Sequence, residues 1–201
     1  MGGASQPRVR MDAATRRALL LDAAAQSFAE HGFAQSGLAE IAQRAGVSKT
    51  LLYHYFPDGR PQLYREVMNA LVADLVGRLR AALRAPVSTE RRLTALVDGF
   101  LGFFGDEPAA FRLLILEPWG SGDPGIVGQA MAIRVRIGAE LNALLSSSGQ
   151  PMAQTQAASA ATVGCLLHVT ELWMSGQVTR DDASAVVGDF VRGGLTQLGL
   201  L

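Results

Sequence analysis

Four hydrogen-bond donors lie close together within residues 32–56, which read GFAQSGLAEIAQRAGVSKTLLYHYF. They are Lys49, Thr50, Tyr53 and His54, and they share about two turns of a short predicted helix. An α-helix fits the major groove of B-DNA, where such groups reach phosphates and base edges. These residue types at this spacing predict contact with DNA, with an ordinary solvated helix face as the alternative.

Other reactive groups in the chain are few. A single cysteine, Cys165, excludes an intrachain disulfide, and the scattered histidines His31, His54 and His168 predict no metal site. The chain shows no Gly-rich phosphate loop, nucleophile elbow or helix with paired carboxylates at catalytic spacing. We therefore expect no cofactor. A helical enzyme and a helical protein-interaction module remain as alternatives to DNA binding.

The elements that must position the four donors are helices, because no stretch alternates as a strand does and Ala, Leu, Arg, Gln and Glu dominate. Within residues 38–55, Gly46 suits a left-handed turn and Ser48 suits a helix cap, which predicts a helix-turn-helix. We expect an all-α chain of about nine helices, over residues 12–30, 38–45, 49–55, 61–83, 91–104, 106–117, 126–145, 151–174 and 179–198.

Residues 19–64 resemble the N-terminal domain of the TetR family of transcriptional regulators. The resemblance rests on an ordered set of short matches: LLDAA with Phe28, HGF at 31–33, IAQRAGVS at 41–48 and LYHYF at 52–56. It implies an all-helical homodimer that binds a palindromic operator, usually as a repressor. It also implies a C-terminal domain that holds a small-molecule pocket and the dimer interface.

The resemblance also implies roles for single residues. It places the donors named above, together with Ser48, on the recognition helix, and Ser36 where the preceding helix touches the DNA backbone. Thr50 stands where the family commonly has glycine, and Gly37 replaces a usual Ser or Thr cap. Arg60 is a candidate replacement for a lysine that clamps a phosphate.

Charge supports a division of the chain into two domains. The formal net charge is zero, which by itself argues against nucleic acid. Residues 1–65, however, hold eight basic and five acidic side chains, which gives a net charge of +3. The remaining residues hold ten basic and thirteen acidic side chains, which gives a net charge of −3. We therefore expect a DNA-binding domain over 1–60 and a ligand-binding and dimerisation domain over 61–201. Arg8, Arg10, Arg16 and Arg17 are candidates for an arm along the DNA backbone, with a solvated tail as the alternative for the first two.

The C-terminal part offers candidates for a pocket and for a dimer surface. The pocket candidates are mainly aromatic, and core packing is the alternative for them: Phe100, Phe104, Phe111, Trp119, Met131, Arg134 and His168. An inward Arg134 would pair with an anionic ligand, whereas His168 is expected first as a buried core histidine. Small and apolar residues on the last two helices predict the dimer surface: Ala161, Gly164, Leu172, Phe190, Gly194 and Leu198.

The sequence favours neither secretion nor a membrane span. The N-terminus lacks the apolar stretch of a signal peptide. Residues 141–170 carry no charged side chain, but the run SSSGQP at 146–151 interrupts them. We expect no membrane partner and a cytoplasmic location.

Overall fold

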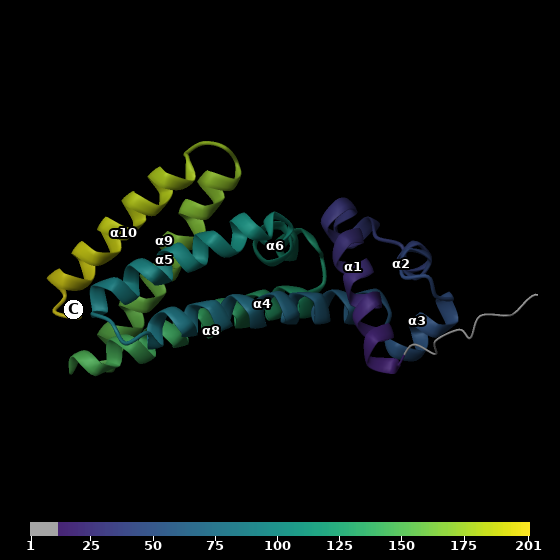
Figure 1. Cartoon of the computed structure of the whole chain (residues 1–201), viewed down its shortest axis with the longest axis horizontal. Coiled ribbons are helices and arrows are strands. Elements are labelled where there is room, and N and C mark those ends of the chain that lie inside the picture. The colour runs from purple at the N-terminus through teal and green to yellow at the C-terminus, as the bar shows by residue number, and fades with distance from the viewer. Residues whose placement is uncertain (1–11) are drawn as a thin grey trace, which may run out of the picture. The chain divides into compact units, whose positions relative to one another are not determined.

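The computed structural model describes residues 12–201, and its secondary structure there is helical throughout (Figure 1). The predicted all-α class is confirmed, and no strand occurs in the described part of the chain. The chain divides into two compact units, Met1–Val67 and Met68–Leu201. The division falls inside helix α4, Arg60–Arg84, whereas the sequence predicts a domain boundary at the start of this helix.

The first unit is built from α1 (Ala13–Gln35), α2 (Leu38–Arg44), α3 (Lys49–Tyr55) and the first turns of α4. Its core is a set of fully buried apolar side chains contributed by all four helices: Leu20, Phe28, Ile41, Leu52, Phe56, Leu63 and Tyr64. The Tyr64 ring meets the Phe28 and Phe33 rings edge-on, at centroid distances of 5.0 and 5.1 Å. These contacts fix α1 against α4.

The end of α1 differs from the prediction that it stops near Gly32. Gly32 does leave the helical conformation, with φ at +77°, but one more turn follows and reaches Gln35. The turn is retained because Phe33 is buried against Tyr64 and because the Ser36 backbone N–H donates to the Gly32 carbonyl at 3.3 Å. The glycine therefore kinks the helix here without ending it.

The connection between α2 and α3 forms as predicted. Gly46 has a φ of +68°, the left-handed conformation that glycine adopts at little cost. The Ser48 hydroxyl accepts a hydrogen bond from the Leu51 N–H at 3.2 Å and caps α3. Helix α3 then begins and ends at the predicted residues.

The second unit is a bundle formed by the rest of α4 and the helical segments that follow it. These are α5 (Thr89–Asp106), α6 (Pro108–Phe111), a π-helical turn (Arg112–Leu116), α7 (Glu117–Gly120), α8 (Pro124–Leu145), a 3-10 turn (Ser146–Ser148), α9 (Met152–Met174) and α10 (Arg180–Gln197). Helix α8 packs on α9, and α10 packs on α5 and α9. Among the described residues, no helix combines the length and apolar character needed to cross a membrane.

Candidate nucleic-acid interface and C-terminal surfaces

Helix α3 presents the four predicted donors on its solvent face. Leu52 is fully buried and anchors the opposite face of the helix in the core of the first unit. Lys49, Thr50, Tyr53 and His54 are all exposed, and they form two pairs spaced by four residues. The structure thus brings the donors together on a helix whose position is fixed by packing.

Tyr53 is held in place although 42 % of it is exposed. Its ring lies beside Gly59, where an added Cβ would meet Tyr53 Cε1 at 3.4 Å and Leu38 Cδ1 at 3.1 Å. Gly59 also has a φ of +67°, so a side chain there would be both strained and crowded. The Lys49 ammonium group lies near the same ring, with Nζ 6.0 Å from the ring centroid. The aromatic ring is therefore positioned by packing against Gly59 before any ligand binds.

A surface hollow of 440 Å³ adjoins this pair and includes the predicted residue Arg60. The Arg60 guanidinium donates to the Ala34 carbonyl at 2.7 Å and lies 4.7 Å from the centroid of the Phe33 ring. These contacts hold the last turn of α1 against the start of α4. Arg60 thus has internal contacts that its sequence context does not predict.

Ser36 requires a correction. It was expected to touch the DNA backbone, but only 1 % of it is exposed, and its hydroxyl donates to the Gly32 carbonyl at 2.7 Å. The side chain closes the kink after α1 instead of facing solvent. The physical reason is that Ser36 ends the extra turn of α1, where its hydroxyl and its backbone N–H both reach the Gly32 carbonyl four residues earlier.

The two described arginines of the predicted arm belong to helix α1. Arg17 forms an ion pair with Glu66, and its guanidinium lies 5.3 Å from the centroid of the Phe56 ring. The Arg16 side chain is half-buried. Arg17 therefore links α1 to α4 within the first unit, while Arg8 and Arg10 lie outside the described residues.

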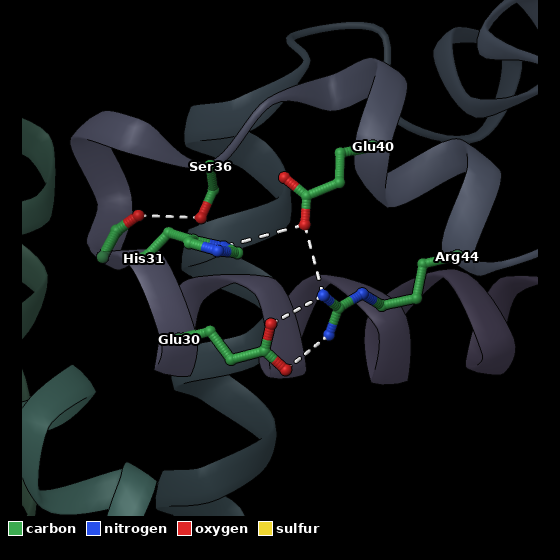
Figure 2. A network of polar contacts seen from close by, with 6 residues as sticks. Glu30, His31, Ser36, Glu40 and Arg44 are labelled. Carbon is green, nitrogen blue, oxygen red and sulfur yellow. Dashed lines mark hydrogen bonds and ion pairs between the residues drawn. The ribbon is translucent and has the colours of Figure 1, made fainter.

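A polar network joins α1 and α2 (Figure 2). The Arg44 guanidinium donates to both carboxylate oxygens of Glu30, at 2.7 and 2.6 Å, and to Glu40 at 3.2 Å. The Arg44 hydrogen bond lowers the pKa of Glu30, and the same bond raises the pKa of Arg44. His31 Nδ1 lies 3.7 Å from Glu40.

The same network places metal-ligating atoms of Glu30, His31 and Glu40 within 4.8 Å of one another, a grouping that the sequence analysis did not predict. The Arg44 guanidinium lies among these carboxylates and already pairs with both of them. The arrangement is that of an ion-pair network between helices. The spacing of Glu40 and Arg44, four residues apart on one helix, is enough to predict their ion pair. The contact of Arg44 with Glu30 depends on how α1 and α2 pack.

The predicted pocket residues separate into two groups in the second unit. Phe100, Phe104 and Phe111 are buried, and Phe104 packs edge-on against the other two at 5.2 and 5.6 Å. Their rings fill the core, which is the alternative given for them above. Trp119 and Met131 are exposed, and the Arg134 guanidinium lies 5.2 Å from the Trp119 centroid.

His168 also requires a correction. Instead of being a buried core histidine, it has a side chain that is 71 % exposed, with Nδ1 3.5 Å from a carboxylate oxygen of Glu171. The apolar residues around it misled the prediction, because Leu166 and Leu167 point to the core while His168 lies on the outer face of α9.

Four of the predicted dimer residues surround a small apolar hollow of 80 Å³ between α9 and α10: Ala161, Phe190, Gly194 and Leu198. Phe190 stands out because 68 % of it is exposed. Gly164 instead lines a groove of 500 Å³ between α8 and α9, which also includes Arg134. Leu172 is half-buried on α9.

Comparison with known proteins agrees with this arrangement. Residues 20–67 match the family described as bacterial regulatory proteins of the tetR family. The HTH-type transcriptional activator FasR of Mycolicibacterium smegmatis is 30 % identical over 188 residues, which cover 92 % of this chain and 85 % of FasR.

Solved structures show the same fold. A TetR-like transcriptional regulator from Rhodococcus sp. RHA1 superposes with a TM-score of 0.74 at 24 % identity, covering 93 % of this chain and 99 % of that one. The regulator FadR from Bacillus subtilis, in complex with stearoyl-CoA, superposes with a TM-score of 0.75 at 16 % identity. The superposition covers 87 % of this chain and 97 % of FadR. Together with the similarity to FasR along the chain, these matches mean that the protein belongs to the TetR family of transcriptional regulators.

Proposed function

We propose that the protein binds a palindromic DNA operator as a homodimer and is controlled by a small molecule. Residues 1–60 would carry DNA binding, and residues 61–201 would carry ligand binding and dimerisation. The observation that best supports the DNA contact is the exposed row of Lys49, Thr50, Tyr53 and His54 on a helix anchored by Leu52. We infer a cytoplasmic regulator without a catalytic role.

Dimerisation is supported by the apolar surface of α9 and α10. Phe190 and Val186 are exposed on α10, and a small hollow lies beside Phe190. An exposed phenylalanine at the rim of an apolar hollow suits a two-fold interface, in which each copy covers the apolar surface of the other. Two copies would place two recognition helices at successive half-sites of the operator.

The effector is proposed to bind in the second unit. The groove between α8 and α9 has apolar walls that include Val163 and Leu167, and the cation of Arg134 lies at its lining. Asn142 lines it too, and its side-chain oxygen is buried without a hydrogen-bond partner. A ligand with an apolar body and a donor group would suit this groove, and its binding would favour a dimer geometry that no longer fits the operator.

Repression is the direction we propose, because a dimer on an operator excludes other proteins from that DNA. Activation is the second candidate, since the relative FasR is named as an activator. Transcription in vitro from a promoter that carries the operator separates the two. Added protein lowers transcript yield in the first case and raises it in the second.

Substitutions on α3 test the DNA contact. Lys49→Ala and Tyr53→Ala should each weaken operator binding by about tenfold or more in a gel-shift titration, because each removes a contact worth ~1–3 kcal/mol. Arg91→Ala is the matched control, since Arg91 is an exposed cation at the start of α5. Circular dichroism should show an unchanged helical content in all three variants.

Unchanged affinity in both α3 variants would exclude this helix as the DNA-reading element. A protein-interaction module would instead show no sequence preference and no loss of DNA affinity as salt is raised.

A further inference from the structure

Another hollow in the C-terminal unit has three arginines among its lining residues. It measures 320 Å³ and lies between the end of α4, the start of α5 and the last turns of α8. The basic residues in its lining are Arg80, Arg84 and Arg92, and Glu140 is its only carboxylate. Leu83 and Leu144 add apolar surface.

The positive charge of this hollow is only partly neutralised. Arg80 pairs with Glu140 at 2.6 Å. Arg92 donates through Nε to the Ala85 carbonyl at 2.9 Å, a neutral acceptor that leaves its charge in place. Within residues 12–201, Arg84 makes no ion pair. Three guanidinium groups therefore face a single carboxylate.

This concentration of charge is not a general property of the unit. Residues 68–201 hold ten arginines and twelve acidic side chains, a net charge of −2. The field at the hollow has the opposite sign, and it lowers the pKa of Glu140. The hydrogen bond from Arg80 contributes most, and the charges of Arg80, Arg84 and Arg136 add to it. An anion that enters the hollow meets the same field.

We propose that this hollow binds the diphosphate group of a small molecule, such as a nucleotide or coenzyme A. Guanidinium groups bind phosphate oxygens through paired, charge-assisted hydrogen bonds, and the two cations without a carboxylate partner can each take one phosphate. The hollow has about ten times the ~30 Å³ that a water molecule occupies in the liquid, so it has room for more than one phosphate. The leucines suit the less polar group attached to the phosphates.

Binding there would join three helices through one ligand. Helix α4 begins at Arg60, in the DNA-binding unit, and ends at the hollow with Arg80 and Arg84. A diphosphate held between α4, α5 and α8 would therefore stabilise one arrangement of the helix that both units share. This regulatory consequence rests on the proposed function, whereas the binding itself does not.

Calorimetric titration of the full chain with pyrophosphate, ADP and coenzyme A tests the site. We expect one ligand per protomer, mutual competition among the three probes, and weaker binding of inorganic phosphate. Arg84→Gln should lower the affinity about tenfold, because it removes a charge-assisted hydrogen bond and no internal ion pair. Glu140→Gln should raise the affinity by removing the opposing carboxylate.

Arg91→Gln is the matched control, because Arg91 is exposed next to Arg92 but does not line the hollow. The proposed site would be wrong if the wild type and Arg84→Gln bound the three probes with equal affinity. It would also be wrong if Arg91→Gln lost as much affinity for the probes as Arg84→Gln. Binding of ADP or coenzyme A that pyrophosphate does not compete with would overturn the diphosphate assignment.

Thermal unfolding checks that each variant is folded before titration. Operator binding by the ligand-free wild type is measured separately, so failure of the diphosphate site and failure of the proposed function give different results.

Discussion

At the scale of single residues, the cations of the first unit differ in what they contact. Arg17, Arg44 and Arg65 each pair with a carboxylate of the same unit. Arg60 is bound to a carbonyl oxygen and lies over an aromatic ring. Lys49, the only lysine in the sequence, makes no ion pair with any described residue. The residue type alone did not distinguish these roles, because each depends on contacts between helices.

Arg60→Ala should destabilise the first unit. It removes a hydrogen bond to Ala34 and a cation–π contact with Phe33, which together are worth about 1–2 kcal/mol. Urea denaturation of the full chain measures the loss in free energy of unfolding. Arg60→Lys, which keeps the charge but not the planar group, should recover part of it. A variant as stable as the wild type that binds DNA poorly would show that Arg60 acts on DNA alone.

The Arg80–Glu140 pair should make stability depend on pH in acid. The hydrogen bond from Arg80 lowers the pKa of Glu140 below its ordinary value of 4.5, so the folded state favours the ionised carboxylate. This contribution is fully present above that value and is lost as pH falls through the folded pKa. The difference in free energy of unfolding between wild type and Glu140→Gln should therefore shrink in acid. A difference that stays constant across the titration would contradict the pair.

At the scale of elements, the helix-turn-helix could be predicted closely and the later surfaces could not. Gly46 and Ser48 encode the turn locally, and Leu52 and Ile41 encode the buried faces through their spacing. The extra turn of α1 and the exposure of His168 depend instead on how distant segments pack. The arginines of the 320 Å³ hollow come from three helices, so no local pattern could reveal their meeting.

The turn itself gives an element-scale prediction. Gly46→Ala should lower stability by about 1 kcal/mol, because alanine is strained at a φ of +68° although no atom lies within 4 Å of its Cβ. Gly77→Ala is the matched control, since it is exposed within α4, also meets no atom, and should stabilise by ~0.5–1 kcal/mol. Urea denaturation measures both changes. Equal effects of the two substitutions would show that the turn conformation is not limiting.

At the scale of the whole molecule, the proposed dimer makes the two DNA-binding units act together. Phe190→Glu should produce a monomer in light-scattering measurements, because it places a charge on the exposed apolar face of α10. Operator affinity should fall by ~100-fold or more, because a monomer engages one half-site. Val87→Glu, at another exposed apolar side chain, serves as the control. If the Phe190→Glu protein remains dimeric, the dimer interface lies on another surface of the molecule.

The internal pairing of Arg17, Arg44 and Arg65 has a kinetic consequence for a DNA-binding protein. Cations that are already paired release few counterions from the duplex, so attraction to random sequence should be weak. Such a protein dissociates from nonspecific DNA quickly and samples the chromosome in short visits instead of sliding over long tracts. Its affinity for random DNA should therefore vary less with ionic strength than its affinity for the operator.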